Sequence, residues 1–231
     1  MSAGLGTNVA LPTGRRLVIP DIHGCAKSLE ALVHQLDLSF TDQLFFLGDY
    51  INKGPNSLGV ITFIQGLIDS GFSVFPLLGN HDQMMLQYLE TREDALASTL
   101  SKLNHSGSIE LQEFEKHLPF FMQLAPYYES GDYLLVHAGF DFDQALPFSD
   151  LDAMLNIRDF RYDASKADGH RIVHGHYPHS FDQIQSAIRD SAPILPLDNG
   201  CVYENREEQG NLLCLNLDNF ELWVQPNVER R

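Results

Sequence analysis

Cysteine is scarce in this sequence, and its placement excludes two kinds of small stabilised domain. The three cysteines, Cys25, Cys201 and Cys214, are an odd number, and no two of them form a C-x-x-C pair. A disulfide framework or a zinc site built from closely spaced thiols would need a different arrangement. This usage favours the reducing cytoplasm as the compartment.

Positive charge is scarce as well. The 15 basic residues are outnumbered by 31 acidic ones, which gives a formal net charge of −16. Non-specific binding to nucleic acid depends on basic patches, so a nucleic-acid partner is not expected. A bound metal ion could still make one pocket locally positive.

Long apolar runs are missing too. No run approaches the roughly 20 residues needed to cross a bilayer, so no membrane partner is expected. Residues 1–14 are small and polar, and we expect them to form a flexible N-terminal arm rather than a signal peptide. With 44% of its 231 residues hydrophobic, the chain can bury one sizeable core. Residues 15–231 are therefore expected to form a single domain.

Strand, loop and helix alternate along the chain, and polar residues stand where each strand ends. Apolar patterns predict strands at 16–20, 43–47, 73–78, 133–136, 171–173 and 194–197, and a terminal hairpin of 211–217 and 221–224. Helical periodicity predicts helices at 25–38, at 56–70 with Pro55 in the first turn, from 80 to about 89, and within a polar excursion over 92–123 that has a turn at 104–108. This organisation predicts an α/β fold with a ligand site at the carboxyl edge of the strands.

Side chains that can bind metal follow five successive strands. They are Asp21 and His23, then Asp49, Asn80 and His81, His137, and finally His174 and His176. Each has an ordinary explanation by itself: Asn80 could cap a helix, Asp82 could be a first-turn acid, and most histidines that follow a strand are hydrogen-bonded in the core. Their recurrence at every strand end instead predicts a common site. Mixed imidazole and carboxylate ligands suit manganese, iron or zinc, and a shared carboxylate can hold two ions about 4 Å apart.

Five motifs carry a family resemblance. They are Asp-Ile-His-Gly (21–24), Gly-Asp-Tyr-Ile-Asn-Lys-Gly-Pro (48–55), Gly-Asn-His-Asp (79–82), His-Ala-Gly (137–139) and Gly-His-Tyr-Pro (175–178). In this order they resemble the phosphoprotein phosphatase branch of the calcineurin-like metallophosphoesterases, which includes bacteriophage lambda phosphatase and the symmetrical diadenosine tetraphosphatases. Residues 197–203 resemble a late block of the bacterial members. The motifs are specific as a set and span most of the chain.

The resemblance implies an α/β fold of two mixed β-sheets, packed as a sandwich and flanked by helices. It also implies two divalent metal ions, manganese foremost and iron or zinc as alternatives. The first ion would be held by Asp21, His23 and Asp49. The second would be held by Asp49, Asn80, His137 and His176, so that Asp49 is the bridge.

The resemblance also assigns roles in catalysis. His81 would be the general acid that protonates the leaving group, and it would contact the substrate phosphate together with Asn80. Lys53 falls where the family usually has a phosphate-binding arginine. Arg158 resembles a second phosphate clamp, with Arg161 as the close rival. His174 is not at a ligand position of the motif and is expected to be structural.

Three residues depart from the family pattern. Pro20 replaces the usual glycine before the first aspartate, which fixes the backbone there. Lys53 replaces arginine, so it keeps the charge but loses the planar two-pronged grip on phosphate. Asn52 replaces the aspartate that normally orients the imidazole of His81. A weakened acid favours substrates with good leaving groups, such as a nucleotide phosphate or the phenolate of phosphotyrosine.

Hydrolysis of phosphomonoesters by metal-bound hydroxide is the expected function, on a phosphoprotein that carries phosphoserine, phosphothreonine or phosphotyrosine. The short chain, close in size to the compact phage-type phosphatases, favours this. The alternative is a dinucleoside polyphosphate hydrolase, because the dinucleotide enzymes of the branch also lack the aspartate at position 52. A third hypothesis is a catalytically silent module that captures phosphorylated partners, although every metal ligand and His81 are intact. The sequence does not indicate the oligomeric state.

Overall fold

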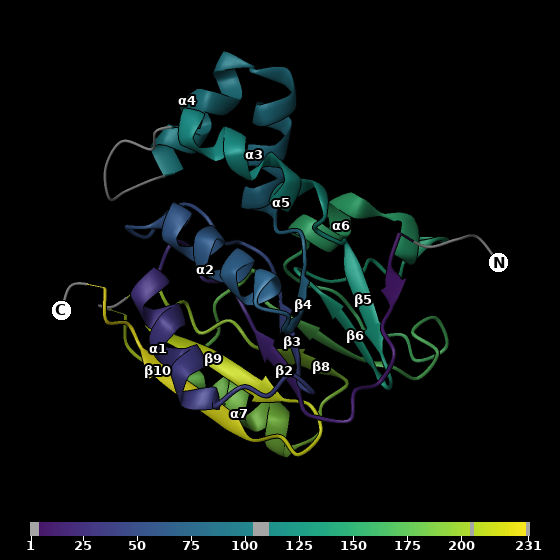
Figure 1. Cartoon of the computed structure of the whole chain (residues 1–231). Helices are drawn as coiled ribbons and strands as arrows, with labels where there is room; N and C mark the ends of the chain where they lie inside the picture. The colour runs from purple at the N-terminus through teal and green to yellow at the C-terminus, as the bar shows by residue number, and fades with distance from the viewer. Residues whose placement is uncertain (1–4, 104–110, 204–205, 230–231) are drawn as a thin grey trace.

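The computed structural model describes residues 5–103, 111–203 and 206–229 (Figure 1). Its strands are β1 (Thr7–Asn8), β2 (Arg16–Ile19), β3 (Gln43–Phe46), β4 (Ser73–Pro76), β5 (Tyr127–Ser130), β6 (Tyr133–Val136), β7 (Arg171–His174), β8 (Ile194–Pro196), β9 (Asn211–Asn216) and β10 (Leu222–Pro226). Its α-helices are α1 (Ala26–Leu36), α2 (Ser57–Asp69), α3 (Asn80–Thr91), α4 (Asp94–Leu103), α5 (Leu118–Met122), α6 (Leu151–Asn156) and α7 (Phe181–Arg189), and two short 3-10 helices are η1 (Leu111–His117) and η2 (Pro147–Ser149).

The strands form two five-stranded mixed sheets. One has the order β10-β9-β2-β3-β4, in which β2, β3 and β4 are parallel, β9 pairs antiparallel with β2, and β10 pairs antiparallel with β9. The other has the order β1-β5-β6-β7-β8, with β6, β7 and β8 parallel. The structure therefore confirms the expected α/β fold of two mixed sheets flanked by helices.

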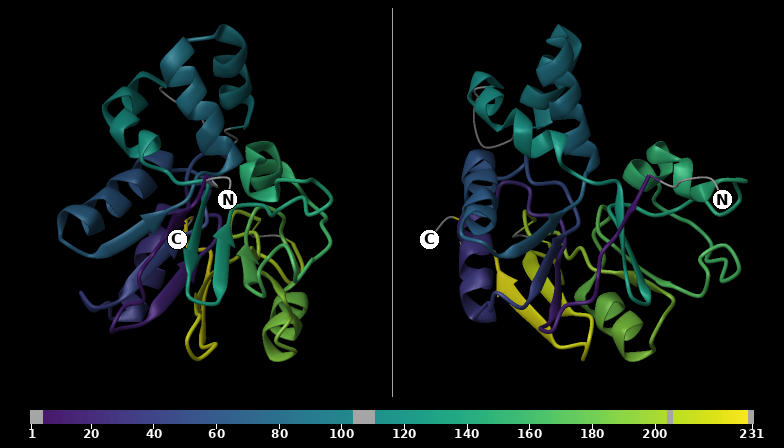
Figure 2. Two further views of the ribbon diagram at one scale, coloured as in Figure 1. Left: turned by 90° about the vertical axis from the view of Figure 1, so that its right-hand side faces the viewer. Right: turned by 45° about the vertical axis from the view of Figure 1, so that its right-hand side comes forward.

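The sheets pack against each other because their strands alternate two apolar faces. In β2, Val18 belongs to the core between the sheets, whereas its neighbours Leu17 and Ile19 belong to the core under the helices α1 and α2. In β6, Leu135 points into the core between the sheets and Val136 into a third cluster, which also contains Met154 of α6. Both views of Figure 2 show α3, α4 and α5 rising beyond one end of the sheets.

All six expected strands and the terminal hairpin are present, but other expectations need correction. Residues 5–14 do not form a free arm: β1 pairs with β5, and Val9 is buried. Pro55 precedes the N-cap of α2, Asn56, instead of standing in its first turn. β5, α6 and α7 were not predicted from the sequence, and the turn expected at 104–108 lies outside the described residues.

Two further observations concern the state of the cysteines and the length of the apolar helices. Cys25, Cys201 and Cys214 are all buried thiols, and none is in a disulfide. Within the described ranges, no helix has the length and apolarity needed to cross a lipid bilayer.

Candidate metal centre

The predicted ligands meet where the parallel strands of both sheets end. The loops after β2 and β3 bring Asp21, His23 and Asp49, the first residue of α3 is Asn80, and the loops after β6 and β7 bring His137 and His176. Two groups have candidate ligand atoms that all lie within 4.8 Å of one another. They are His23 with Asp49 and His81, and Asp49 with His137 and His176. Asp49 is the member that both groups share.

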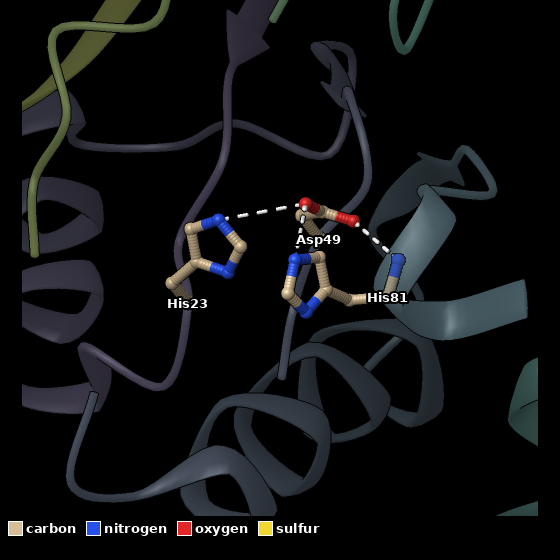
Figure 3. A group of neighbouring side chains, drawn as sticks. All are labelled: His23, Asp49 and His81. Carbon is tan, nitrogen blue, oxygen red and sulfur yellow. Dashed lines mark hydrogen bonds and ion pairs between the residues drawn. The ribbon is translucent and has the colours of Figure 1, made fainter. Parts of the chain in front are cut away.

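Asp49 lies in the middle of the cluster (Figure 3). Its Oδ2 is 3.4 Å from Nε2 of His23 and 3.9 Å from Nε2 of His81. Its Oδ1 is 3.6 Å from Nε2 of His137 and accepts a hydrogen bond of 3.0 Å from the backbone N–H of His81. The two oxygens thus face different imidazoles, which is the arrangement a carboxylate needs to bridge two ions.

Backbone carbonyls hold two of the imidazoles with a lone pair toward the centre. Nδ1 of His23 donates to the carbonyl oxygen of Ile51 at 3.0 Å, and Nδ1 of His137 donates to that of Leu47 at 2.8 Å. With its proton on Nδ1, each neutral ring presents an unprotonated Nε2 to the site. Metal-binding histidines are usually oriented in this way.

The acceptor atoms of this cluster indicate whether positively charged ions fit the site. Nε2 of His137 is 3.1 Å from Oδ1 of Asn80, an atom that can only accept. Among the described residues, neither Oδ2 of Asp21 nor Nε2 of His176 has a hydrogen-bond partner, although both are buried. Nδ1 of His176 lies 3.1 Å from Nε2 of His137 and Nζ of Lys53 lies 2.6 Å from Nε2 of His23, but acceptors still outnumber donors here, and converging acceptors are costly unless a positive charge lies between them. The His and Asp side chains are thus positioned to hold divalent metal ions.

Burial and neighbouring charges shift the pKa values of Asp21 and Asp49 in opposite directions. Burial and the neighbouring charge of Asp49 raise the pKa of Asp21 well above its ordinary value. Burial would also raise the pKa of Asp49, but the imidazoles of His137, His81 and His23 outweigh it and lower that pKa. Burial, together with His137, lowers the pKa of His176 to about 4. Burial therefore favours the neutral form of the His176 imidazole, which is the form that binds metal.

Backbone strain is concentrated at this site. Of the eleven non-glycine residues with positive φ in the described part of the chain, five belong to the site: His23, Asp49, Asn52, Lys53 and His176, with φ between 48° and 68°. Such conformations are uncommon outside glycine and persist only where the surroundings enforce them. The strain aims these side chains at the centre.

Two motif glycines allow close approach of the backbone. A Cβ at Gly79 would collide with the side chain and backbone N of Asp49, and one at Gly175 would collide with Oδ1 of Asp21. The backbone N–H of His176 donates to that same oxygen at 2.9 Å. These contacts explain why glycine precedes both Asn80 and His176.

Asp82 is a residue whose importance the sequence analysis missed. It is fully buried, and its carboxylate accepts backbone hydrogen bonds from Asp49 (2.7 Å), Tyr50 (3.1 Å) and Gly79 (3.1 Å). It ties the loop after β3 to the N-terminus of α3. Its position in the first turn, three residues after Gly79, is the only signal in the sequence.

Asp198 was also missed as a member of the site. It follows β8, is buried and accepts a hydrogen bond from the backbone N–H of Gly200 at 2.7 Å. Burial and the charge of Asp21 raise its pKa well above its ordinary value. Its place at the end of a strand was the available signal.

Asn52 and Lys53 both turn toward the centre. Nδ2 of Asn52 donates to Nδ1 of His81 at 3.0 Å, while Oδ1 of Asn52 has no partner within the described part of the chain. Nζ of Lys53 donates to Nε2 of His23 at 2.6 Å. Burial, aided by the charge of Lys53, lowers the pKa of His81 below its ordinary value.

The two candidate arginines lie in different surroundings. Arg158 is exposed, its guanidinium carbon is 5.7 Å from the centre of the Tyr177 ring, and its charge helps to lower the pKa of His176. Arg161 instead lines a separate hollow with Asp141 and Asp159. Arg158 is therefore the arginine placed near the site.

His174 packs away from the ligands. It is buried, and its ring makes edge contacts with Phe160 and His179. Burial lowers its pKa to about 3, so it is a neutral core histidine. This agrees with the structural role expected from its position outside the motif.

Comparison with known families agrees with this geometry. Residues 14–212 match the model of the calcineurin-like phosphoesterases. The chain belongs to that family. It is thus a metallophosphoesterase, a hydrolase of phosphoester bonds, as the motifs predicted at the level of the superfamily.

Relatives of this phosphoesterase narrow the comparison further. It is 37% identical over 126 residues to the symmetrical bis(5'-nucleosyl)-tetraphosphatase of Coxiella burnetii, and these residues are 53% of this chain and 40% of that relative. It is 33% identical over 150 residues to the enzyme of the same name from Acidovorax ebreus, and these residues are 62% of this chain and 52% of that relative. The matched part is only about half the length of these curated relatives.

Solved structures support the fold of this phosphoesterase. A crystal structure of a proposed diadenosine tetraphosphatase superposes with a TM-score of 0.69 at 21% identity and covers 98% of this chain and 99% of the other. A serine/threonine phosphatase from Saccharomyces cerevisiae superposes with a TM-score of 0.65 at 14% identity, over 99% and 85% of the two chains. At these identities the likeness shows the fold alone.

Lys53→Ala should raise KM for small phosphate substrates about tenfold and lower kcat less. A lysine beside the metal centre attracts the phosphate in the ground state and the transition state alike, so its loss weakens binding more than the chemical step. Steady-state kinetics with p-nitrophenyl phosphate would measure both constants. Lys116→Ala, at an exposed lysine of η1, is the matched control. An unchanged KM would show that Lys53 does not contact the phosphate.

Proposed function

We propose that this phosphoesterase cleaves the phosphoanhydride chain of a dinucleoside polyphosphate such as diadenosine tetraphosphate. The observation that carries the proposal is the contact of 3.0 Å between Nδ2 of Asn52 and Nδ1 of His81. An amide nitrogen can only donate, so Nδ1 of His81 accepts, and the ring proton stands on Nε2.

This contact weakens His81 as an acid. The imidazolium form needs a proton on Nδ1, where the Asn52 amide already points, and no carboxylate stabilises that charge from behind the ring. Nε2–H can still donate a hydrogen bond to a phosphate oxygen. A serine alkoxide leaves poorly without full protonation, whereas a nucleotide phosphate needs little. The site therefore suits an anhydride better than an alkyl ester.

The names of the relatives support the same substrate. The curated enzymes from Coxiella burnetii and Acidovorax ebreus are named symmetrical bis(5'-nucleosyl)-tetraphosphatases. The earlier preference for a phosphoprotein gains no such support from them. We therefore place the dinucleotide ahead of the phosphoprotein as substrate.

The roles of the side chains follow from their positions. Asp21, His23 and Asp49 would hold one divalent ion, and Asp49, Asn80, His137 and His176 the other, with manganese, iron or zinc as candidates. When bound, such ions supply positive charge against the phosphate and lower the pKa of water. Lys53 and Arg158 attract the phosphate chain, and His81 orients the leaving oxygen. The buried thiols are consistent with a cytoplasmic enzyme.

A phosphotyrosine protein is the second candidate substrate, and the same contact favours it. Phenolate is a better leaving group than a serine alkoxide, so a weak acid at His81 suffices. Phosphoserine and phosphothreonine proteins rank below it for the opposite reason. A silent binding module ranks last because the complete set of metal ligands and His81 are brought together.

The test is a comparison of kcat/KM for three substrates: diadenosine tetraphosphate, a phosphotyrosine peptide and a phosphoserine peptide. We expect the dinucleotide to be preferred by at least about tenfold over either peptide. A preference for a peptide would refute the proposal, and no turnover of any substrate with metal bound would favour the silent module.

Asn52→Asp should selectively speed hydrolysis of the phosphoserine peptide, by about tenfold or more. The new carboxylate would accept from Nδ1 and raise the pKa of His81, so its protonated, acidic form would persist to higher pH. The rate on the phosphoserine peptide should therefore be measured against pH for both proteins. Identical profiles, with the same ratio of alkyl to anhydride rates, would show that residue 52 does not act through His81.

A further inference from the structure

A hollow of about 360 Å³ opens beside the metal centre, between α3 and α6. Asn80, a candidate metal ligand, is part of its wall, so the hollow begins where the substrate phosphate would lie. Ligand pockets for small molecules typically start at about 300 Å³. The hollow thus has room for a substituent of the phosphate chain.

One face of α3 forms the wall of this hollow. Asn80, Gln83, Met84 and Gln87 follow the spacing i, i+3, i+4, i+7, so they form one stripe along the helix. With a rise of 1.5 Å per residue, the stripe runs about 10 Å from the metal centre toward Gln87. A group attached to a bound phosphate could therefore extend along it.

The chemistry of the wall is that of a site for an uncharged, planar ligand. Its lining includes no lysine or arginine, and its one acid, Asp152, accepts a hydrogen bond of 2.9 Å from Asn156. Phosphate groups would need cations here, and none lines the hollow. Gln83 is half-buried and Gln87 is exposed, so their side-chain amides are accessible to a ligand.

Apolar side chains complete the hollow. Met84 comes from α3, Leu96 from α4 and Leu155 from α6. Flat apolar contacts on the faces and amides at the edge match a nucleobase, because glutamine amides pair with the donor and acceptor edge of adenine.

We propose that this hollow binds one nucleoside of the dinucleotide substrate, with the amides of Gln83 and Gln87 on the edge of the base. The assignment rests on the proposed function and adds the residues that select the nucleoside. In this assignment, positively charged groups bind the phosphates at one end of the site, and the neutral amides bind the base at the other end.

The experiment compares wild type, the double variant Gln83→Met/Gln87→Met and the control Gln123→Met, an exposed glutamine outside the hollow. Methionine keeps the length and helix propensity of glutamine but cannot pair with a base. For each protein, kcat/KM is measured for diadenosine tetraphosphate and for p-nitrophenyl phosphate, which carries no nucleoside. We expect the ratio of the two values to fall about tenfold or more in the double variant, through a higher KM for the dinucleotide, and to stay unchanged in the control.

The outcomes separate the two proposals. If wild type cleaves diadenosine tetraphosphate and the double variant shows the same ratio, the nucleoside site is wrong and the proposed function stands. An equal fall in the control would also overturn the site. If wild type cleaves p-nitrophenyl phosphate but not diadenosine tetraphosphate, the proposed function fails, and the nucleoside site with it.

Discussion

Asp49→Asn should abolish hydrolysis, by at least about a hundredfold, and should loosen both metal ions. The carboxylate of Asp49 is shared by the two candidate ligand groups, so its neutralisation removes an anionic ligand from each ion at once. Asparagine has nearly the same shape, and its Oδ1 can still accept the hydrogen bond from the backbone N–H of His81. The loss should therefore not come from unfolding.

Turnover of p-nitrophenyl phosphate measures the loss of hydrolysis, and elemental analysis after dialysis measures the loss of metal. Asp69→Asn, at an exposed aspartate that ends α2, is the matched control and should keep both metal and activity. A thermal melt verifies that both variants are folded. Full retention of two ions per chain in Asp49→Asn would contradict the bridging role.

His81→Ala should lower kcat for a phosphoserine peptide about a hundredfold, but for p-nitrophenyl phosphate or diadenosine tetraphosphate by less than about tenfold. Nε2 of His81 lies 3.9 Å from Oδ2 of Asp49, at the edge of the centre where a leaving oxygen would depart. Only a poor leaving group depends on the proton or hydrogen bond that this nitrogen donates.

Rates with saturating metal isolate the chemical step in this comparison. His34→Ala, at an exposed histidine near the end of α1, controls for loss of an imidazole elsewhere. Equal losses for all three substrates would mean that His81 serves as a metal ligand, in line with its distance from His23 and Asp49, and not as an acid.

The convergence of the candidate metal ligands could be predicted from the sequence because of a local rule. Each of Asp21, Asp49, Asn80, His137 and His176 follows an apolar segment, and parallel strands end at one edge of their sheet. The six predicted strands follow from similarly local patterns. The two-residue strand β1 was missed because its stability comes from pairing with β5, more than 100 residues away, and not from its own sequence.

Contacts between segments that are distant in the chain could not be predicted from local sequence patterns. Asp82 looks like a helix-capping acid, and only the folded chain shows that it holds the backbone of Asp49 and Tyr50. The choice between Arg158 and Arg161 depends on which side of the loop after α6 faces His176, and three residues of spacing do not decide that.

By itself, the sequence determined the family, the α/β order of strands and helices and the side chains that meet at the candidate metal centre, because these depend on local periodicity and on motifs. Only the tertiary structure decided that the Asn52 amide donates to His81, that glycines 79 and 175 leave room for the ligand carboxylates, and that α3 and α6 enclose an amide-lined hollow. These features depend on how two sheets and a helical lobe approach one another, and that approach is set by packing between residues far apart in the chain.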